Sequence, residues 1–352
     1  MTIWGEIIIA KVIIGKNYLR NSLAQKEEIY KSISRFIDNS IEARYKFSLK
    51  SEICKIIITI DENSIIVEDN SGGISENISE EELFKIDCNN GNGSGLGIKK
   101  SFFTLGKKIE IFSNKRELSR VFSLDTSEND QELESKSKSV NYDDDKEEGA
   151  RIVISNLNAN IKKYIKRSDY KNTLKQELGY MYRKFIDKNK VIILVNGELV
   201  ESRSVNGVKL CSMHMNKYNV RLYKGNKGEN SGIEVFINDY MKLDRENGKK
   251  EVKWTKLRQP KYTYENCVVE VDYYGEVSEY EESKELFYEQ LIEFIKDNKE
   301  SFKNRTITIQ YEVSIDKVEE LKEYYNEISA KAIGKKAFDK LYEIYKMENK
   351  KS

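Results

Sequence analysis

Apolar residues along the chain change their spacing repeatedly, and each spacing predicts a local structure. Residues 24–46 carry apolar side chains at steps of four, three and one, which form one stripe on a helix: Ile29, Ile33, Phe36, Ile37 and Ile41. Residues 53–60 and 65–68 are rich in isoleucine and valine, and they predict two strands around the turn 61–64. The first part of the chain therefore combines helix and strand.

Other segments extend this mixed pattern through residue 155. The further elements expected here are a strand at 6–14, a helix from Leu96, a hairpin formed by 107–113 and 118–124, and a strand at 151–155. The stretch 126–148 is acidic and serine-rich with few apolar residues, so we expect a mobile loop there.

The second half of the chain predicts another mixed region followed by helices. After a helix at 168–187, the run VIILV meets Asn196-Gly197, the strongest short signal for a hairpin turn. The remaining elements are expected as strands at 219–224, 232–238 and 266–273, a helix at 284–299, a strand at 305–313 and a helix from 316. These segments predict an α+β chain in three parts, 1–155, 156–275 and 276–352.

Composition narrows the function classes. The 352 residues include 60 Lys and Arg against 59 Asp and Glu, so the net charge of +1 gives little general attraction to nucleic acid. The best local basic patch is IKKYIKR at 161–167, which also fits a solvated helix face. The four cysteines are too far apart for a zinc clip, and no signal pattern or long apolar span is present. We therefore expect a cytoplasmic protein without a membrane segment.

Two short polar boxes carry candidate binding chemistry. The first, SRFIDNSIEA at 34–43, places Asp38 and Asn39 on the polar face of the first long helix, where a carboxamide oxygen can bind Mg²⁺. The second, EDNSGGI at 68–74, ends a strand with a carboxylate and two glycines. A carboxylate there can accept a hydrogen bond from an exocyclic amine, and the glycines allow a flat base to approach the backbone. Taken singly, each box also fits an ordinary solvated face or turn.

The third box, GNGSGLGIKKS at 91–101, precedes a predicted helix. Backbone amides in such a loop, together with the helix N-terminus, can bind phosphate, and Lys99 or Lys100 can add charge. The box lacks the Gly-Lys-Ser/Thr ending of a Walker A loop. Alone it also fits a flexible glycine loop.

In this order and spacing, the three boxes resemble the GHKL superfamily of ATPases, which includes histidine kinases, gyrase-type topoisomerases, MutL-type repair proteins and MORC proteins. The resemblance covers residues 1–155 and implies the Bergerat ATP-binding fold, a two-layer α/β sandwich with ATP and Mg²⁺ held under a lid. It implies that Asn39 binds Mg²⁺, Asp69 holds the adenine amine and Gly73 flanks the base. The phosphate contacts it implies are Gly95, Gly97 and Lys99.

The chain departs from the family pattern at one position. Hydrolysing members usually carry a glutamate general base four residues before the Mg²⁺-binding asparagine, and here that residue is Arg35. Arginine stays protonated and cannot accept a proton. We therefore expect slow or absent hydrolysis, with Arg35 as a contact to the terminal phosphate. Asp38 is the nearest candidate for a substitute base, while Glu28 is too far along the helix axis.

The region 156–275 resembles the transducer domain of MutL-like and MORC-like members, which implies an ATP-gated switch that dimerises around a DNA or protein partner. Lys253, Lys256 and Lys261 are candidate γ-phosphate sensors, although surface lysines look the same in sequence. A chaperone-like scaffold and an active DNA-associated ATPase of repair or defence type remain alternatives. A sensor histidine kinase is disfavoured, because the only histidine, His214, lies far downstream of the ATP domain.

Overall fold

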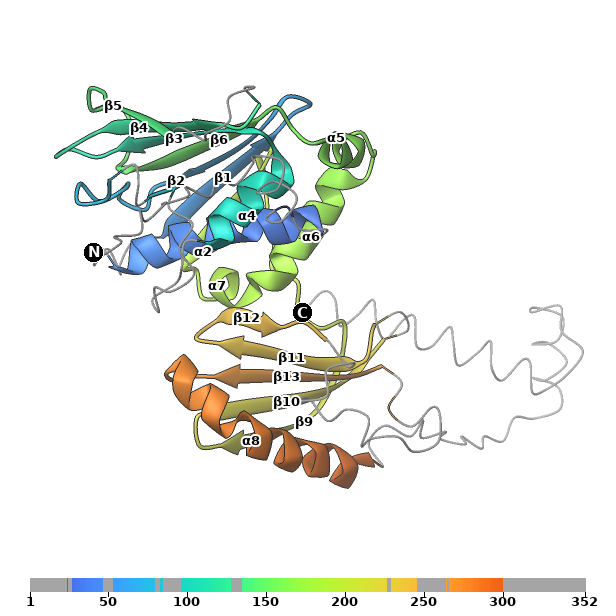
Figure 1. Ribbon diagram of the computed structural model, residues 1–352. Helices are drawn as coiled ribbons and strands as arrows, with labels where there is room; N and C mark the ends of the chain where they lie inside the picture. The colour runs from blue at the N-terminus through green and yellow to red at the C-terminus, as the bar shows by residue number, and fades with distance from the viewer. Residues whose placement is uncertain are drawn as a thin grey trace, which may run out of the picture. The chain divides into compact units, whose positions relative to one another are not determined.

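The first part of the computed structural model is an eight-stranded mixed sheet with helices packed on one face (Figure 1). The structure describes residues 24, 27–46, 53–79, 83–84, 96–127, 135–226, 229–245, 264 and 266–299. The sheet order is β5-β4-β3-β6-β2-β1-β7-β8, and every neighbouring pair is antiparallel except β1 and β7. The strands are β1 (Cys54–Ile60), β2 (Ser64–Asp69), β3 (Lys108–Asn114), β4 (Arg120–Asp125), β5 (Ser135–Ser139), β6 (Gly149–Ser155), β7 (Val191–Val195) and β8 (Glu198–Leu199).

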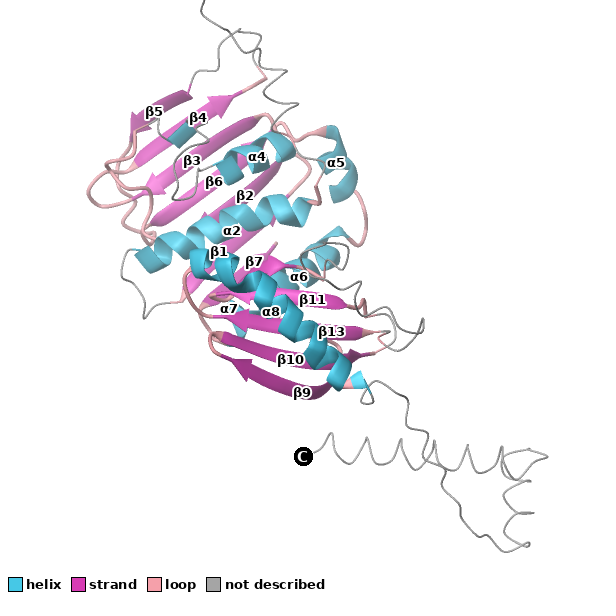
Figure 2. Cartoon of the chain, turned by 60° about the horizontal axis from the view of Figure 1, so that its bottom comes forward, coloured by secondary structure: helices cyan, strands magenta, loops and turns pink. Residues whose placement is uncertain are grey.

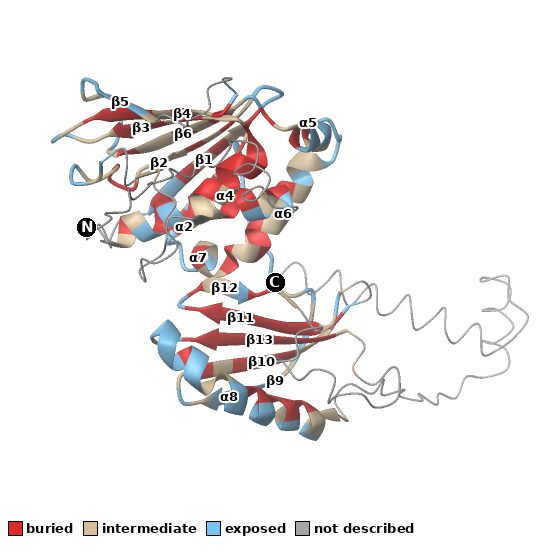
Figure 3. Ribbon diagram, in the orientation of Figure 1, coloured by how far each residue is buried: buried red, intermediate tan, exposed pale blue. Residues whose placement is uncertain are grey.

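Helices cover the apolar face of this sheet because their own apolar stripes face it. They are α2 (Ile29–Lys46), α4 (Leu96–Leu105), α5 (Ala159–Ile165), α6 (Tyr170–Met181) and α7 (Arg183–Asp187). Ile33, Phe36, Ile37 and Ile41 of α2 are all fully buried, as the predicted stripe requires, and they join one core with alternate residues of the strands. Figure 3 shows buried residues on α2, on α4 and along the strands of the sheet. The predicted Bergerat-type two-layer sandwich is confirmed.

A second, five-stranded mixed sheet follows, in the order β12-β11-β13-β10-β9. Its strands are β9 (Gly207–Met215), β10 (Tyr218–Gly225), β11 (Gly232–Ile237), β12 (Tyr240–Leu243) and β13 (Cys267–Tyr273). The helix α8 (Val277–Asp297) lies across one face of this sheet (Figure 2). Tyr218 of β10 stacks on Phe287 of α8, with ring centroids 3.9 Å apart. The opposite face presents charged side chains, which matter below.

Several predicted boundaries are corrected. The helix predicted at 168–187 is broken at Tyr182, and α8 begins seven residues before the predicted position 284 because Glu276 and Glu279 form a capping box. The stretch 126–148 is not wholly a loop, since β5 pairs with β4 along the sheet edge. Its serine and lysine alternation carries no apolar signal, so only the backbone pairing reveals it. The helix α5 and the strands β9 and β12 were not expected.

The first sheet crosses the predicted division at residue 155. The hairpin around Asn196 and Gly197 forms as predicted, but β7 pairs in parallel with β1 instead of beginning a new sheet. The division into three parts stays a prediction. The strand expected at 6–14, the strand at 305–313 and the helix from 316 lie outside the described residues. No helix in the described ranges has both the length and the apolar composition needed to cross a membrane.

Candidate nucleotide site

The side chain of Asp69, the last residue of β2, connects three elements. Its Oδ2 accepts a hydrogen bond from Ser40 Oγ of α2 at 2.6 Å. Its Oδ1 accepts hydrogen bonds from the Ser71 amide (2.9 Å), the Ser71 hydroxyl (2.5 Å) and the Ala150 amide of β6 (3.1 Å). This carboxylate is therefore held in one orientation on the helix-covered side of the sheet. Sequence reasoning singled out Asp69, but its partners Ser40 and Ala150 carry no signal of their own.

The backbone around Gly73 and Gly149 leaves no room for side chains at these two positions. Gly72 and Gly73 have φ values of 90° and 70°, in the left-handed region that favours glycine. A Cβ at Gly73 would lie 2.9 Å from Ser113 Oγ and 3.1 Å from the Asn114 carbonyl oxygen. The strand β6 approaches equally closely, because a Cβ at Gly149 would lie 1.8 Å from the carbonyl oxygen of Asp69. We call this closely packed backbone around Gly73 and Gly149 the cradle, and the part played by Gly149 carries no signal in the sequence.

A buried arginine fixes the turn that follows the glycines. Arg120 of β4 is 8% exposed, and its guanidinium donates to the carbonyl oxygens of Ile78 (2.9 Å) and Ser75 (2.8 Å). The Ile74 amide donates to Ser113 Oγ at 2.8 Å. The segment after Gly73 is thus tied to both β3 and β4, which fixes its position beside the cradle.

The third box meets the first at the start of α4. A Cβ at Gly97 would lie 3.2 Å from Cδ of Arg35, and Arg35 Nη1 donates to Ser101 Oγ of α4 at 3.1 Å. Lys99 lies on the same helix and is buried, and this burial lowers the pKa of the Lys99 side chain. Two predicted phosphate-site residues, Gly97 and Lys99, therefore lie on a helix that contacts Arg35. The third, Gly95, lies outside the described residues.

Arg35 also forms an ion pair that the sequence did not suggest. Its Nη1 lies 2.5 Å from Glu27 Oε1, and its Nη2 lies 2.8 Å from Glu27 Oε2. Ser32 Oγ donates to the same carboxylate at 2.6 Å. Glu28 is too far along the helix axis from Asn39 to act as a substitute base. Glu27, which precedes the first turn of α2, is the carboxylate that reaches back to Arg35.

The other predicted site residues of α2, Asn39 and Asp38, differ in their surroundings. Asn39 is exposed on the polar face. The hydroxyl of Tyr182 lies 2.7 Å from Asp38 Oδ1 and 2.8 Å from the Ser34 carbonyl oxygen. Burial raises the pKa of Asp38 to about 6, even though the hydrogen bond from Tyr182 lowers it. This contact favours a structural role for Asp38, and its role as a base stays a prediction.

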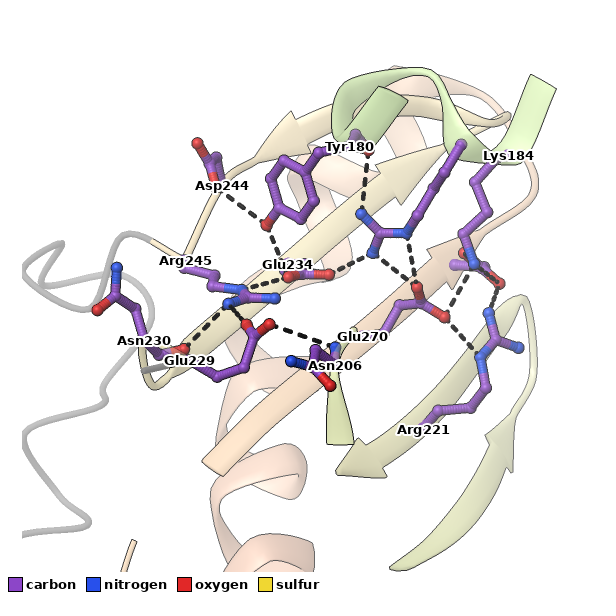
Figure 4. Close-up of polar contacts among 12 residues, drawn as sticks. Tyr180, Lys184, Asn206, Arg221, Glu229, Asn230, Glu234, Asp244, Arg245 and Glu270 are labelled. Carbon is purple, nitrogen blue, oxygen red and sulfur yellow. Dashed lines mark hydrogen bonds and ion pairs between the residues drawn. The ribbon is translucent and has the colours of Figure 1, made fainter. Parts of the chain in front are cut away.

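Tyr182 also leads directly to the second sheet, because it separates α6 from α7. The next residue, Arg183, enters a group of acidic side chains on β11 and β13 that we call the acidic socket: Glu234, Glu270 and Asp272 (Figure 4). Arg183 is 1% exposed and Glu234 is fully buried. Arg183 Nη2 contacts Glu270 at 2.6 Å and also pairs with Glu234, while its guanidinium lies 4.3 Å from the ring centroid of Phe236.

Neighbouring cations complete the charge balance of the acidic socket. Lys184 Nζ lies 2.9 Å from Glu270 and 3.0 Å from Asp272, and Arg221 of β10 pairs with the same two carboxylates. Arg245 pairs with Glu234. Among these groups, the attraction of Arg183 and Lys184 holds the pKa of Glu270 at about 2 despite its burial. Arg183 and Lys184, the two residues after the break at Tyr182, are therefore anchored in the second sheet.

The predicted lysine sensors Lys253, Lys256 and Lys261 lie outside the described residues, and His214 lies on β9 of the second sheet. Comparison with known proteins supports the assignment of the first sheet. Residues 28–150 match the family model described as "Histidine kinase-, DNA gyrase B-, and HSP90-like ATPase". No curated protein matches the chain.

Among solved structures, the chain is similar to the 43K ATPase domain of Thermus thermophilus gyrase B in complex with an aminocoumarin. The identity is 14%, the TM-score is 0.40, and the match covers 77% of this chain and 85% of that one. The family assignment rests on the family model, whose span begins just before α2 and ends in β6. It thus contains all three boxes and the cradle around Asp69. Residues 28–150 therefore form a GHKL-type ATPase domain.

Proposed function

We propose that this domain binds ATP with Mg²⁺ and that the chain acts as a nucleotide-gated conformational switch. In this proposal Asp69 accepts a hydrogen bond from the adenine amine beside Gly73, and Asn39 provides an oxygen ligand to Mg²⁺. The phosphates lie at the start of α4 with Gly95, Gly97 and Lys99. The observation that carries the proposal is the orientation of Asp69, held by Ser40 and the Ala150 amide beside a backbone that excludes side chains.

Calorimetric titration with a non-hydrolysable ATP analogue and Mg²⁺ tests the binding site. We expect saturable binding by the unaltered protein and a loss of about tenfold or more in affinity for Asp69→Asn, because a charge-assisted hydrogen bond to the base is weakened. Asp61→Asn is the matched control, because it makes the same change from carboxylate to amide in an exposed hairpin turn. Absence of heat in the unaltered protein would contradict the proposal.

We further propose that hydrolysis is slow, because Arg35 replaces the general base. The loss of a general base typically lowers the rate about a hundred- to ten-thousandfold. The pair between Arg35 and Glu27 suggests a direct test by charge exchange, in which the double variant Glu27→Arg and Arg35→Glu places a carboxylate on α2 and keeps the ion pair. We expect phosphate release to rise at least about a hundredfold. Turnover of the unaltered protein at about one per second or faster would contradict this part.

The contacts of Tyr182 and Arg183 support the switch. Tyr182 bonds to the turn of α2 between Ser34 and Asp38, whose next neighbours are Arg35 and Asn39. Arg183 is buried in the acidic socket of the second sheet. A shift of α2 on nucleotide binding is therefore transmitted to the second sheet through two adjacent residues. We propose that this shift gates dimerisation around a DNA or protein partner.

Sizing of the protein by light scattering tests the gated dimer. We expect a change from monomer to dimer with Mg²⁺ and the non-hydrolysable analogue, and no change with ADP. Tyr182→Phe should uncouple dimerisation from nucleotide binding, because it removes only the hydroxyl that bonds to α2. A mass that stays the same with and without the analogue, in a protein shown by calorimetry to bind it, would contradict the dimerisation switch.

A further inference from the structure

Glu27 is an acidic side chain that contacts Arg35, the residue proposed to bind the terminal phosphate of ATP. Its carboxylate contacts both terminal nitrogens of Arg35, at 2.5 and 2.8 Å. Arg35 Nη1 also contacts Ser101 of α4, and the aliphatic part of Arg35 passes beside Gly97 in the first turn of that helix. The paired side chains are 28% exposed for Arg35 and 12% for Glu27. The carboxylate is therefore largely shielded from water while it neutralises this cation.

A phosphate group arriving at the start of α4 would compete for the same nitrogens. Carboxylate and phosphate oxygens bind a guanidinium with the same forked geometry, so one replaces the other without rearrangement of the arginine. Burial alone raises the pKa of Glu27, but hydrogen bonds from Arg35 and Ser32 outweigh it and leave the pKa below its ordinary value. Glu27 is thus ionised at neutral pH, and an incoming anion must displace a charged competitor.

We propose that Glu27 is a specificity-determining residue that occupies Arg35 until the terminal phosphate of ATP takes its place. The proposal rests on the ATP binding and the Arg35–phosphate contact proposed above. ATP binding exchanges one ion pair of Arg35 for another, whereas ADP lacks the γ-phosphate and leaves the Glu27–Arg35 pair intact. Glu27 therefore lowers the affinity for ATP selectively and sets the ratio at which the site discriminates ATP from ADP.

A purely structural role for the pair makes a different prediction. If Glu27 only fastened the chain before α2, its substitution would loosen the site and weaken both nucleotides alike. Glu27→Gln separates the two roles, because the amide keeps an oxygen acceptor for Arg35 and Ser32 but loses the charge. Glu28→Gln is the matched control, since this neighbour is exposed and carries the same charge.

The experiment measures dissociation constants for a non-hydrolysable ATP analogue and for ADP, both with Mg²⁺, by calorimetry. The proteins are the unaltered chain, the single variants Glu27→Gln, Glu28→Gln and Arg35→Met, and the double variant Glu27→Gln/Arg35→Met. We expect Glu27→Gln to tighten the ATP analogue about tenfold and to change ADP by less than about twofold, because one charge-assisted pair no longer competes. In the Arg35→Met background, Glu27→Gln should have no effect on either nucleotide.

Several outcomes overturn the proposal. Unchanged or weaker binding of the ATP analogue by Glu27→Gln does so, as does an equal change for ADP. An effect that persists without Arg35 shows that Glu27 acts elsewhere. If the unaltered chain binds neither nucleotide, the ATP site itself fails. If the unaltered chain binds the ATP analogue but Glu27→Gln has no selective effect on it, the proposed role of Glu27 is wrong and the proposed ATP site stands.

Discussion

Replacing Asp38 by asparagine should stabilise the folded protein at neutral pH, although it removes a charged residue next to the proposed metal ligand. The asparagine side chain keeps an oxygen that accepts the hydrogen bond of Tyr182, and it removes a charge that burial penalises. The pKa of Asp38 is raised to about 6 from an ordinary value of 3.8. This difference corresponds to a cost of at most about 3 kcal/mol in the free energy of unfolding.

The pH dependence follows from the direction of the shift. Below about pH 4 the carboxyl group is protonated in both the folded and the unfolded chain, so it imposes no penalty. As pH rises toward 6, the unfolded chain ionises first, and the stability associated with the folded carboxyl group is lost. The advantage of Asp38→Asn over the unaltered protein should therefore grow between about pH 4 and 6 and stay constant above that range.

Urea denaturation from pH 5 to 8 measures this advantage. Asp61→Asn is an informative control, because backbone hydrogen bonds from Asn63 and Ser64 lower the pKa of Asp61. Its substitution should give a small loss of stability that is constant over this range. A gain for Asp38→Asn that is equal at pH 5 and pH 8, or a loss at pH 8, would refute the argument from burial. If the same variant also abolished measurable ATP turnover, Asp38 would be the substitute base.

Two further pairs of substitutions test the packing of the acidic socket and of the cradle. Arg183→Met leaves the acidic socket with uncompensated buried charge and should cost about 3–5 kcal/mol in urea denaturation, whereas Arg221→Met, at a half-exposed position, should cost clearly less. Equal losses would show that burial of the pair is not decisive. Gly149→Ala forces a methyl group against the Asp69 carbonyl oxygen and should weaken nucleotide binding at least about tenfold in calorimetry. Gly197→Ala, where nothing lies within 4 Å, should leave nucleotide affinity unchanged, and equal affinities for the two variants would contradict the cradle.

The sequence was informative wherever local periodicity or a short box carried the signal. The apolar stripe of α2, the strands β1 and β2, and the turn after Asp69 follow from spacing within a few residues. The box at 91–101 correctly placed the start of α4 near Leu96. Such features depend on neighbours along the chain, so a single sequence contains them.

The parts that escaped prediction depend on residues far apart in the sequence. Tyr182 reaches Asp38 across 144 positions, and Arg183 reaches Glu270 across 87. A charged residue in a helix looks like a solvated face until the second sheet supplies its partners. The edge strand β5 has no apolar pattern, and its pairing with β4 along the sheet edge is what defines it. Neither periodicity nor composition encodes contacts of this kind.

The helix α2 connects Asp69, α4 and Tyr182, because different residues along it contact each of them. Ser40 holds the carboxylate of Asp69, Arg35 contacts α4 and Glu27, and Asp38 bonds to Tyr182. An α-helix moves as a rigid unit over one or two turns, so these contacts cannot change independently. Coupling between sites is reciprocal in free energy. If the proposed switch operates, a partner that binds the second sheet and shifts Arg183 should change nucleotide affinity by the same factor by which nucleotide changes the affinity of that partner.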